Sequence, residues 1–402
     1  PCSRALEMRV TISFFLAFLA VGVLLSSCRR DEVFVYSQQE LVDTPPEEDP
    51  EIVGLYVLNS GVKGNNEATL DYFDCLTSTY HRNIYAERNP DALPSLGDNG
   101  TDLAVADGKL YVILSGSHRL EIFNVENTQR FATVSINNPR RILLRDNYAY
   151  ITSYLKQKEQ KYGELPLGEL VRIKTDDLTD IRKITLGCQP DEMLYFVAGN
   201  ESTGSEKETL LLVSNTGEYN SPHFDNRLSV VNLDNFVQTS YIRTGTSPHC
   251  LAISGRYLYV ETSGNYKEEP PQLCILRDKS NLNTFTRDTV RDLPSLSFVQ
   301  VDDTLFMIKG RKNQFGDILE RDFVKYSMKA DDIVDRFVAD GTETQIETPT
   351  SVAVHPVTHE IFITDARRGT SSGLLYCYTP DGRQKWKVKT GIAPCKVAFV
   401  KK

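Results

Sequence analysis

The chain has 402 residues, of which 40% are hydrophobic, 9% aromatic and 25% charged. This composition is typical of a folded globule and excludes a disordered chain. Its 45 basic and 54 acidic side chains give a net charge of −9, which argues against nucleic acid or anionic lipid as the ligand, because either would need a basic footprint.

The first 27 residues predict a secretory signal. Residues 10–25 form an apolar stretch that follows Arg9 and ends in Leu25-Ser26-Ser27-Cys28, which gives the charged, apolar and small-residue regions of such a signal. The stretch is shorter than the about 20 residues that a bilayer-spanning helix needs, so a permanent transmembrane helix is the weaker interpretation. We expect a signal peptide over residues 1–27, in which residues 1–7 precede a more natural start at Met8.

The cysteine at the cleavage position resembles that of a bacterial lipobox. The resemblance implies cleavage before Cys28 and attachment of lipid to it, with an ordinary secreted protein as the alternative. Residues 28–51 are polar, acidic and contain proline, and we expect a solvated tether there. The charged residues directly behind Cys28 also resemble the export signal of Bacteroidetes surface lipoproteins. This implies a lipid-anchored outer-membrane protein that faces the cell exterior.

Residues 52–98 predict the first strands of an all-β fold. Alternating apolar residues indicate three strands, near Leu55-Tyr56-Val57, Leu70-Asp71-Tyr72-Phe73 and Arg82-Asn83-Ile84-Tyr85. The first of them looks like the second strand of a four-stranded unit, because no strand is expected ahead of it.

One pattern then recurs seven times along the rest of the chain. Each copy has a turn, often with proline, then an alternating strand, a tight turn and a second strand. The anchors of the copies are Gly100, Pro139, Pro190, Pro248, Pro294, Pro349 and Pro394. They are 39 to 58 residues apart, close to the roughly 40 to 50 expected for one propeller blade, so seven anchors predict seven blades.

The last copy supplies only one strand, over residues 395–400. We expect this strand to complete the blade begun by residues 52–98, which closes the ring with three strands from one terminus and one from the other. Closure leaves no unpaired sheet edge between the first and last blades. The prediction is a seven-bladed β-propeller over residues 52–402.

Six further cysteines are predicted to be buried free thiols. They are Cys75, Cys188, Cys250, Cys274, Cys377 and Cys395. Most fall in different blades, too far apart for the roughly 7 Å limit between bonded cysteines, although an exported protein could carry disulfides. The chain has no Cys-x-x-Cys pair that would indicate zinc.

The longest insertions are expected on one face of the propeller. When the strands of a blade are named A to D from the axis outward, the extra length falls mainly between B and C, at residues 154–169, 216–226, 265–272, 311–322 and 367–373. Only residues 200–208 are expected on the opposite face. Insertions gathered on one face indicate a binding surface, whereas neutral loop drift would scatter them over both.

Aromatic and basic side chains in these connections are the candidate ligand-binding residues. Such side chains bury large areas at low entropic cost, although local packing is the alternative for each one. The candidates are Tyr154, Tyr162, Tyr219, His223, Phe224, His249, Tyr266, Phe315 and Arg367.

Catalytic and metal-binding patterns are not found. His355 and His359 are four apart, but Pro356 follows the first, so the segment predicts a turn rather than a helix with paired metal ligands. Asp365 beside Arg367 could act as a ligand or a base, but the position is also ordinary turn chemistry. We therefore expect no catalytic residue, no metal and no cofactor, and no enzyme, with carboxylates converging from separate blades as the open alternative.

Both ends of the predicted propeller resemble a known family. The segments that carry the resemblance are Gly54-Leu55-Tyr56-Val57-Leu58-Asn59-Ser60-Gly61 and Val354-His355-Pro356-Val357-Thr358-His359-Glu360-Ile361-Phe362-Ile363-Thr364-Asp365-Ala366. They look like the opening and closing blades of YncE-like, YVTN-type propeller lipoproteins of Bacteroidetes. The best-understood relatives of that family are BtuG-type cobalamin-binding proteins, which pass vitamin B12 to a TonB-dependent transporter.

The resemblance implies a corrinoid or similarly large amphipathic ligand on the loop face, without covalent chemistry, and a TonB-dependent outer-membrane transporter as partner. No corrinoid-contacting residue of the relatives can be matched one for one. Two other functions stay open: a protein-binding or adhesion propeller with a flat apolar patch, and a hydrolase or lactonase with carboxylates clustered at the channel mouth.

Overall fold

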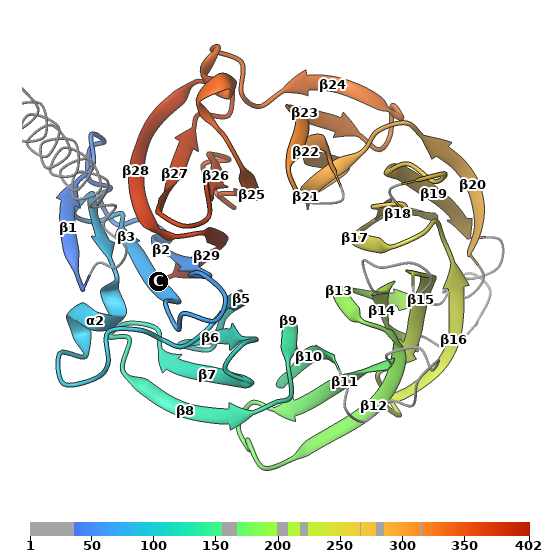
Figure 1. The fold of residues 1–402 in the computed structure, drawn as a ribbon, viewed down its shortest axis with the longest axis horizontal. Coiled ribbons are helices and arrows are strands. Elements are labelled where there is room, and N and C mark those ends of the chain that lie inside the picture. The colour runs from blue at the N-terminus through green and yellow to red at the C-terminus, as the bar shows by residue number, and fades with distance from the viewer. Residues whose placement is uncertain are drawn as a thin grey trace, which may run out of the picture. The chain divides into compact units, whose positions relative to one another are not determined.

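Seven antiparallel sheets surround a central axis in the computed structural model (Figure 1). The structure describes residues 36–154, 167–198, 208–217, 224–265, 267–278, 285–313 and 316–402. Tyr162, Tyr219, His223, Tyr266, Phe315 and the predicted lipidation site Cys28 lie outside these residues. Over the described part of the chain, the prediction of an all-β propeller with seven blades is confirmed.

Six of the sheets have four strands that follow one another from the axis outward. The first three are β5–β8 (Gly100–Ala106, Lys109–Leu114, Arg119–Asn124, Arg130–Ser135), β9–β12 (Pro139–Arg145, Tyr148–Tyr154, Leu167–Lys174, Ile181–Cys188) and β13–β16 (Pro190–Ala198, Glu208–Gly217, Phe224–Asn232, Val237–Arg243). The next three are β17–β20 (Pro248–Ser254, Tyr257–Thr262, Gln272–Asp278, Phe285–Arg291), β21–β24 (Ser295–Val301, Thr304–Lys312, Ile318–Ser327, Asp332–Arg336) and β25–β28 (Pro349–Val354, Ile361–Asp365, Ser372–Tyr378, Gln384–Ile392). A short 3₁₀ helix, η3 (Thr342–Gln345), precedes β25.

The seventh sheet joins the two ends of the propeller, as the sequence predicts. Its innermost strand is β29 (Pro394–Lys401), which pairs with β2 (Ile52–Asn59), followed outward by β3 (Thr69–Asp74) and β4 (Thr79–Arg82). Val57 lies opposite Val397 in this antiparallel register. The last strand of the propeller therefore hydrogen-bonds to its first.

Two details of this blade differ from the sequence prediction. The third strand was expected to continue through Tyr85, but β4 ends at Arg82 and helix α2 (Ile84–Arg88) follows. Asn83 causes the change, because its φ of 52° breaks the extended backbone and its side chain accepts a hydrogen bond from the Ala86 N–H. In addition, β1 (Gln38–Leu41), inside the segment expected to be a solvated tether, pairs with β4 as a fifth strand.

Six of the inner strands begin at the sequence anchors, and β21 begins one residue after Pro294. Every one of the seven has a register shift directly after its first residues, as between Gly100 and Asp102 or between Pro349 and Ser351. Such a bulge places two residues opposite one and turns the following side chain to a new direction. The recurring turn motif therefore marks the start of each inner strand and its bulge.

Apolar side chains fill the space between neighbouring blades. Leu58 and Leu70 of the closing blade pack with Leu103, Leu110 and Phe123 of the next, and all five are buried. Burying one such side chain contributes about 1.5–3 kcal/mol, so each blade depends on both neighbours. The six cysteines from Cys75 to Cys395 are free thiols, as predicted; four of them are buried, whereas Cys250 and Cys395 are only partly buried.

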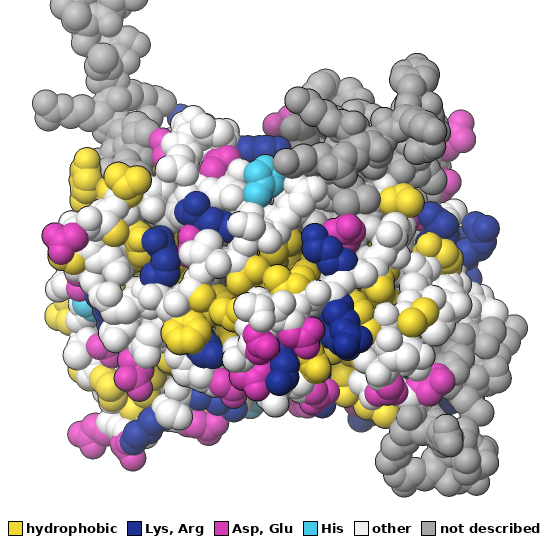
Figure 2. Space-filling model, turned by 90° about the horizontal axis from the view of Figure 1, so that it is seen from below, with side chains coloured by type: hydrophobic (Ala, Val, Ile, Leu, Met, Phe, Trp, Pro, Cys, Tyr) yellow, Lys and Arg dark blue, Asp and Glu magenta, His cyan; other side chains and the backbone are white. Residues whose placement is uncertain are grey.

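The rim of the ring carries charges of both signs (Figure 2). On the side shown, basic and acidic side chains are interspersed and apolar ones lie between them, so the visible described residues form no broad patch of one sign. Among the residues that the structure describes, no helix is both long enough and apolar enough to cross a membrane.

Candidate functional site

The predicted insertions connect the second and third strands of their blades. Residues 155–166, 218–223, 263–271, 313–317 and 366–371 each separate a B strand from a C strand. Since chain direction alternates within a blade, these connections share one face with those that lead into the inner strands. We call this the B–C face. The strands that flank residues 199–207 (β13 and β14) and residues 279–284 (β19 and β20) meet these segments at the opposite face, and both segments lie outside the described residues.

Two of the predicted site residues lie beside the inner strands on the B–C face. Tyr154 ends β10, and the guanidinium carbon of Arg140 lies 4.9 Å from the centre of its ring. His249 is the second residue of inner strand β17, and its Nδ1 is 3.2 Å from the Ser263 Oγ. Burial lowers the pKa of His249 to about 4, so this imidazole is neutral at pH 7.

The other two described candidates are not part of this group. Phe224 begins β15, the third strand of its blade, opposite Gly217. Arg367 forms an ion pair of 2.8 Å with Glu347, and its N–H donates to the Asp365 carboxylate. Asp365 also accepts hydrogen bonds from the N–H groups of Glu347 and Thr348, so it organises the turn before β25.

The structure brings together a charged set that the sequence analysis did not select. The set lies at the bulges of four consecutive inner strands, β29, β5, β9 and β13. Arg141 and Glu192 are within their bulges, and Asp102 and Lys396 directly follow theirs. In the other three blades, Cys250 and Ser351 also lie two residues after the anchor, and Ser297 lies three residues after Pro294, directly after the bulge of β21. We call the four charged residues, with Asp191, the mouth cluster. Except for Asp191, which directly follows Pro190, the members share a place two residues after an anchor, and this shared place is the signal that would have found them.

Ion pairs connect the mouth cluster across blade boundaries. The Nε of Arg141 lies 3.1 Å from Asp191 Oδ1 and 3.0 Å from Glu192 Oε1. The Nζ of Lys396 lies 3.5 Å from Asp102 Oδ1. The Oδ2 of Asp102 also accepts a hydrogen bond from the Ile142 N–H, so each acid is fixed relative to the next blade.

The surroundings keep most of this cluster charged. Burial lowers the pKa of Arg141, but the carboxylates of Asp191 and Glu192 outweigh it and raise that pKa above its ordinary value. Asp102 raises the pKa of Lys396. Burial would raise the pKa of Asp191, yet Arg141 and the neighbouring cations hold it below its usual range, whereas burial keeps the pKa of Glu192 raised. Of this pair of acids, Glu192 is thus the one that takes up a proton first as pH falls.

A cavity of about 280 Å³ adjoins the cluster inside the ring. Glu192 and Lys396 line one part of it. Apolar side chains of β21, β25 and β29 line another part, among them Phe298, Val352 and Phe399. The cavity therefore offers a ligand both charged groups and an apolar wall.

The residues considered for metal binding serve local structure. The Nδ1 of His355 faces the N–H groups of Val357 and Thr358 within the expected turn, at 3.2 and 3.0 Å. Within the described residues, no group of three or more His, Cys, Asp or Glu side chains is arranged to hold a metal ion.

Comparisons with known proteins support the fold. No protein-family model matches the chain, and no curated protein matches its sequence. A crystal structure of a quinonprotein alcohol dehydrogenase-like protein from Bacteroides thetaiotaomicron is similar, with a TM-score of 0.56 and 13% identity, over 87% of this chain and 78% of that one. This similarity supports the propeller fold of the chain.

Two further solved structures agree with this architecture. A proposed 6-phosphogluconolactonase from Bacteroides fragilis has a TM-score of 0.53 and 8% identity, over 89% of this chain and 100% of that one. A functionally unknown protein from Desulfotomaculum acetoxidans has a TM-score of 0.53 and 13% identity, over 85% of this chain and 98% of that one. Identities this low carry the fold and not the activity.

Proposed function

We propose that this propeller is a surface-exposed outer-membrane lipoprotein that captures a small amphipathic molecule on its B–C face. Cobalamin is the leading ligand, and a TonB-dependent transporter is the partner that receives it. One observation carries the proposal: the five long B–C connections share the face on which the inner strands present the mouth cluster. Binding sites gather where variable loops surround a rigid scaffold.

The chemistry of the mouth supports a large amphipathic ligand. Tyr154 presents an aromatic ring supported by Arg140, and such rings stack on planar groups. Arg141 and Lys396 offer donors to amide or phosphate oxygens, and the acids of the cluster accept hydrogen bonds. Phe298 and Phe399 provide the apolar contact. A corrinoid, the ligand that the family resemblance implies, combines amide and phosphate groups with a wide apolar ring.

We propose capture without covalent change. The charged side chains of the mouth already neutralise one another in ion pairs, which suits binding and orientation of an intact ligand. Mass spectrometry of cyanocobalamin recovered after incubation with the protein should return the molecule unchanged. A modified product would support the enzyme alternative instead.

Calorimetric titration with cyanocobalamin tests the ligand. The full chain in detergent should release heat at micromolar protein, and Tyr154→Ala should weaken binding at least tenfold through lost stacking. Phe131→Ala is the matched control, because this aromatic is 60% exposed on the outer strand β8, and its affinity should equal that of the parent protein. No heat with the parent protein would remove the corrinoid and leave capture of another nutrient open.

The proposed anchor and location need a separate test. Metabolic labelling with a radioactive fatty acid should mark the full chain and not Cys28→Ala, and protease added to intact cells should digest the labelled protein. Equal labelling of both forms, or complete protection from protease, would contradict the surface-lipoprotein part of the proposal.

A further inference from the structure

The cavity inside the ring changes character along the axis. Its lining comes from five inner strands, β13, β17, β21, β25 and β29, all of which begin on the B–C face. In each of them, the first residue that lines the cavity carries a charge, a hydroxyl or a thiol; these residues are Glu192, Cys250, Ser297, Ser351 and Lys396. Every later lining residue of the same strands is apolar. The cavity is therefore polar at the mouth and apolar deeper in the ring.

Glu192 and Lys396 lie on opposite sides of this cavity. Between their strands, β13 and β29, lie β5 and β9 on one side of the ring and β17, β21 and β25 on the other (Figure 1). Arg141 and Lys396 oppose the burial that raises the pKa of Glu192, and Glu192 adds to the effect of Asp102, which raises the pKa of Lys396. Glu192 and Lys396 form no direct ion pair, so a ligand can connect them.

Both side chains keep capacity for a ligand. The Nε of Arg141 approaches Oε1 of Glu192 at 3.0 Å, and among the described residues no hydrogen bond reaches Oε2. The Nζ of Lys396 lies 3.5 Å from Asp102 Oδ1, longer than the about 2.7–2.9 Å of a charge-assisted hydrogen bond, and an ammonium group has three donors. The side chains of Glu192 and Lys396 are 28% and 36% exposed, so a ligand can reach both through the mouth.

The charges of the mouth cluster and its neighbour Arg140 balance. Three acids stand beside three cations: Asp102, Asp191, Glu192, Arg140, Arg141 and Lys396. A ligand with a net charge would leave one sign in excess within a partly buried site, which costs free energy. A ligand with one positive group, one negative group and no net charge keeps the balance.

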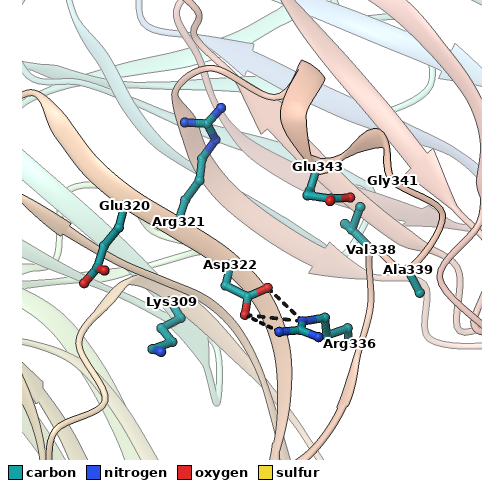
Figure 3. Close-up of a pocket in the computed structure, with 9 residues that line it drawn as sticks. All are labelled: Lys309, Glu320, Arg321, Asp322, Arg336, Val338, Ala339, Gly341 and Glu343. Atoms are coloured by element: carbon teal, nitrogen blue, oxygen red, sulfur yellow. Dashed lines mark hydrogen bonds and ion pairs between the residues drawn. The ribbon is translucent and has the colours of Figure 1, made fainter.

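Another cavity, of about 570 Å³, shows no such convergence. It is lined by strands β22, β23 and β24 and by the connection to β25. Lys309 and Arg321 point in different directions there (Figure 3). The Nε of Arg336 donates to Asp322 at 3.1 Å. Its charged groups are therefore not arranged around one ligand, unlike those of the cavity inside the ring.

We propose that the cavity inside the ring binds an apolar α-amino acid in its zwitterionic form. Glu192 accepts hydrogen bonds from the ammonium group, and Lys396 donates to the carboxylate. The apolar side chain lies deeper, against Phe298, Val352 and Phe399. A volume of about 280 Å³, just below the roughly 300–1,000 Å³ of pockets for drug-sized ligands, suits a molecule of this size. The site rests on the proposed function, because the ligand enters through the same mouth, but it does not depend on cobalamin.

Calorimetric titration of the full chain in detergent with four probes tests the proposal. The probes are leucine, N-acetylleucine, leucinamide and glycine, and the last three remove in turn the ammonium group, the carboxylate and the apolar side chain. Leucine should bind saturably with a dissociation constant below about 1 mM. Each of the other three should bind at least tenfold more weakly, because each leaves one part of the site without its partner.

Variants of the two charged residues separate recognition from folding. Glu192→Gln should weaken leucine binding at least tenfold and leave the binding of N-acetylleucine unchanged, because that probe has no ammonium group. Lys396→Gln should weaken leucine binding equally and leave that of leucinamide unchanged. Lys401→Gln, an exposed cation on the same strand outside the cavity, is the matched control and should bind leucine like the parent protein. If a variant fails to fold, the four probes still decide on the parent protein.

Three results would overturn the site. They are the absence of saturation by leucine up to about 10 mM, equal binding of leucine and either blocked probe, and equal effects of Glu192→Gln and Lys401→Gln. Heat from cyanocobalamin without heat from leucine would overturn the amino-acid site alone and leave capture in place. Heat from leucine without heat from cyanocobalamin would support the site and remove only the corrinoid.

Discussion

The residues of the mouth cluster come from four different blades and lie close together only because the ring closes. His249 and Tyr154 could be selected from the sequence by their chemistry. His249 interacts with Asp191 of the mouth cluster, and Tyr154 packs against Arg140, the residue before Arg141. The sequence analysis missed Arg141 and Lys396, because an isolated basic residue near the start of a strand carries no signal. The bulge that turns each side chain and the meeting of four blades depend on tertiary structure, so only a comparison of equivalent positions in the repeats would have revealed the cluster.

His249 predicts a loss of stability in acid. Its folded-state pKa of about 4 lies below the ordinary value of 6.5, so the unfolded chain binds the proton more tightly as pH falls from 6.5 to 4. The free energy of unfolding should therefore drop over this window, by about 1 kcal/mol at pH 5 after allowance for partial exposure. Urea unfolding at pH 7 and pH 5 measures it.

Replacement of this histidine isolates its contribution. Between pH 7 and pH 5, the free energy of unfolding of His249→Asn should fall by about 1 kcal/mol less than that of the parent protein, because no imidazole remains to take up a proton. His359→Asn, in the exposed A–B turn, is the control and should keep the full loss. Identical pH dependence of His249→Asn and the parent protein would show that this imidazole is not desolvated.

Strands were easier to predict than the short elements between them. Alternating apolar residues mark each inner strand, because one face of every blade packs against the next blade. The five-residue helix α2 and the four-residue strand β1 carry no such alternation. The left-handed backbone of Asn83 determines the start of α2, and pairing with β4 determines β1. Neither cause is visible in a local sequence pattern.

Substitution of Asp365 tests how much the turns that lead into the inner strands contribute to stability. Its buried carboxylate accepts hydrogen bonds from the N–H groups of Glu347, Thr348 and Arg367, at 3.0, 2.7 and 2.9 Å. Asp365→Ala leaves these donors without an acceptor and should lower the free energy of unfolding by about 3 kcal/mol. Chemical denaturation measures the loss.

Two further variants complete this test. Asp365→Asn keeps one acceptor oxygen and should lose roughly half as much as Asp365→Ala. Asp91→Ala, at an exposed position outside the strands, should unfold like the parent protein. An alanine variant as stable as Asp91→Ala would mean that the turn does not depend on the carboxylate.

Residues 52–402 form a closed ring, and the closure could be predicted from the sequence. Seven anchors and a last strand without a following partner predicted that residues 395–400 pair with the first blade, as β29 and β2 do. The ligand could not be predicted in the same way. The candidate residues lie in connections of variable length, and the positions of all seven blades decide which of them come together.

Because the ring closes through β29, loss of this strand should destabilise the whole propeller and not only one blade. Deletion of residues 393–402 removes β29 and exposes one edge of β2, so the circular dichroism of the truncated protein should show no cooperative unfolding. Deletion of residues 1–41 removes only the outer strand β1 from this blade and should leave a cooperative transition. A truncated protein that melts like the parent would show that the ring is stable when open.

Hydrogen exchange with and without saturating cyanocobalamin tests capture on one face most directly. The account predicts slower exchange in the ends of β9 and β10 near Arg140 and Tyr154, at the start of β17 near His249, and in the B–C connections, with no change in residues 199–207. Protection confined to residues 199–207 and 279–284, or protection nowhere, would contradict it.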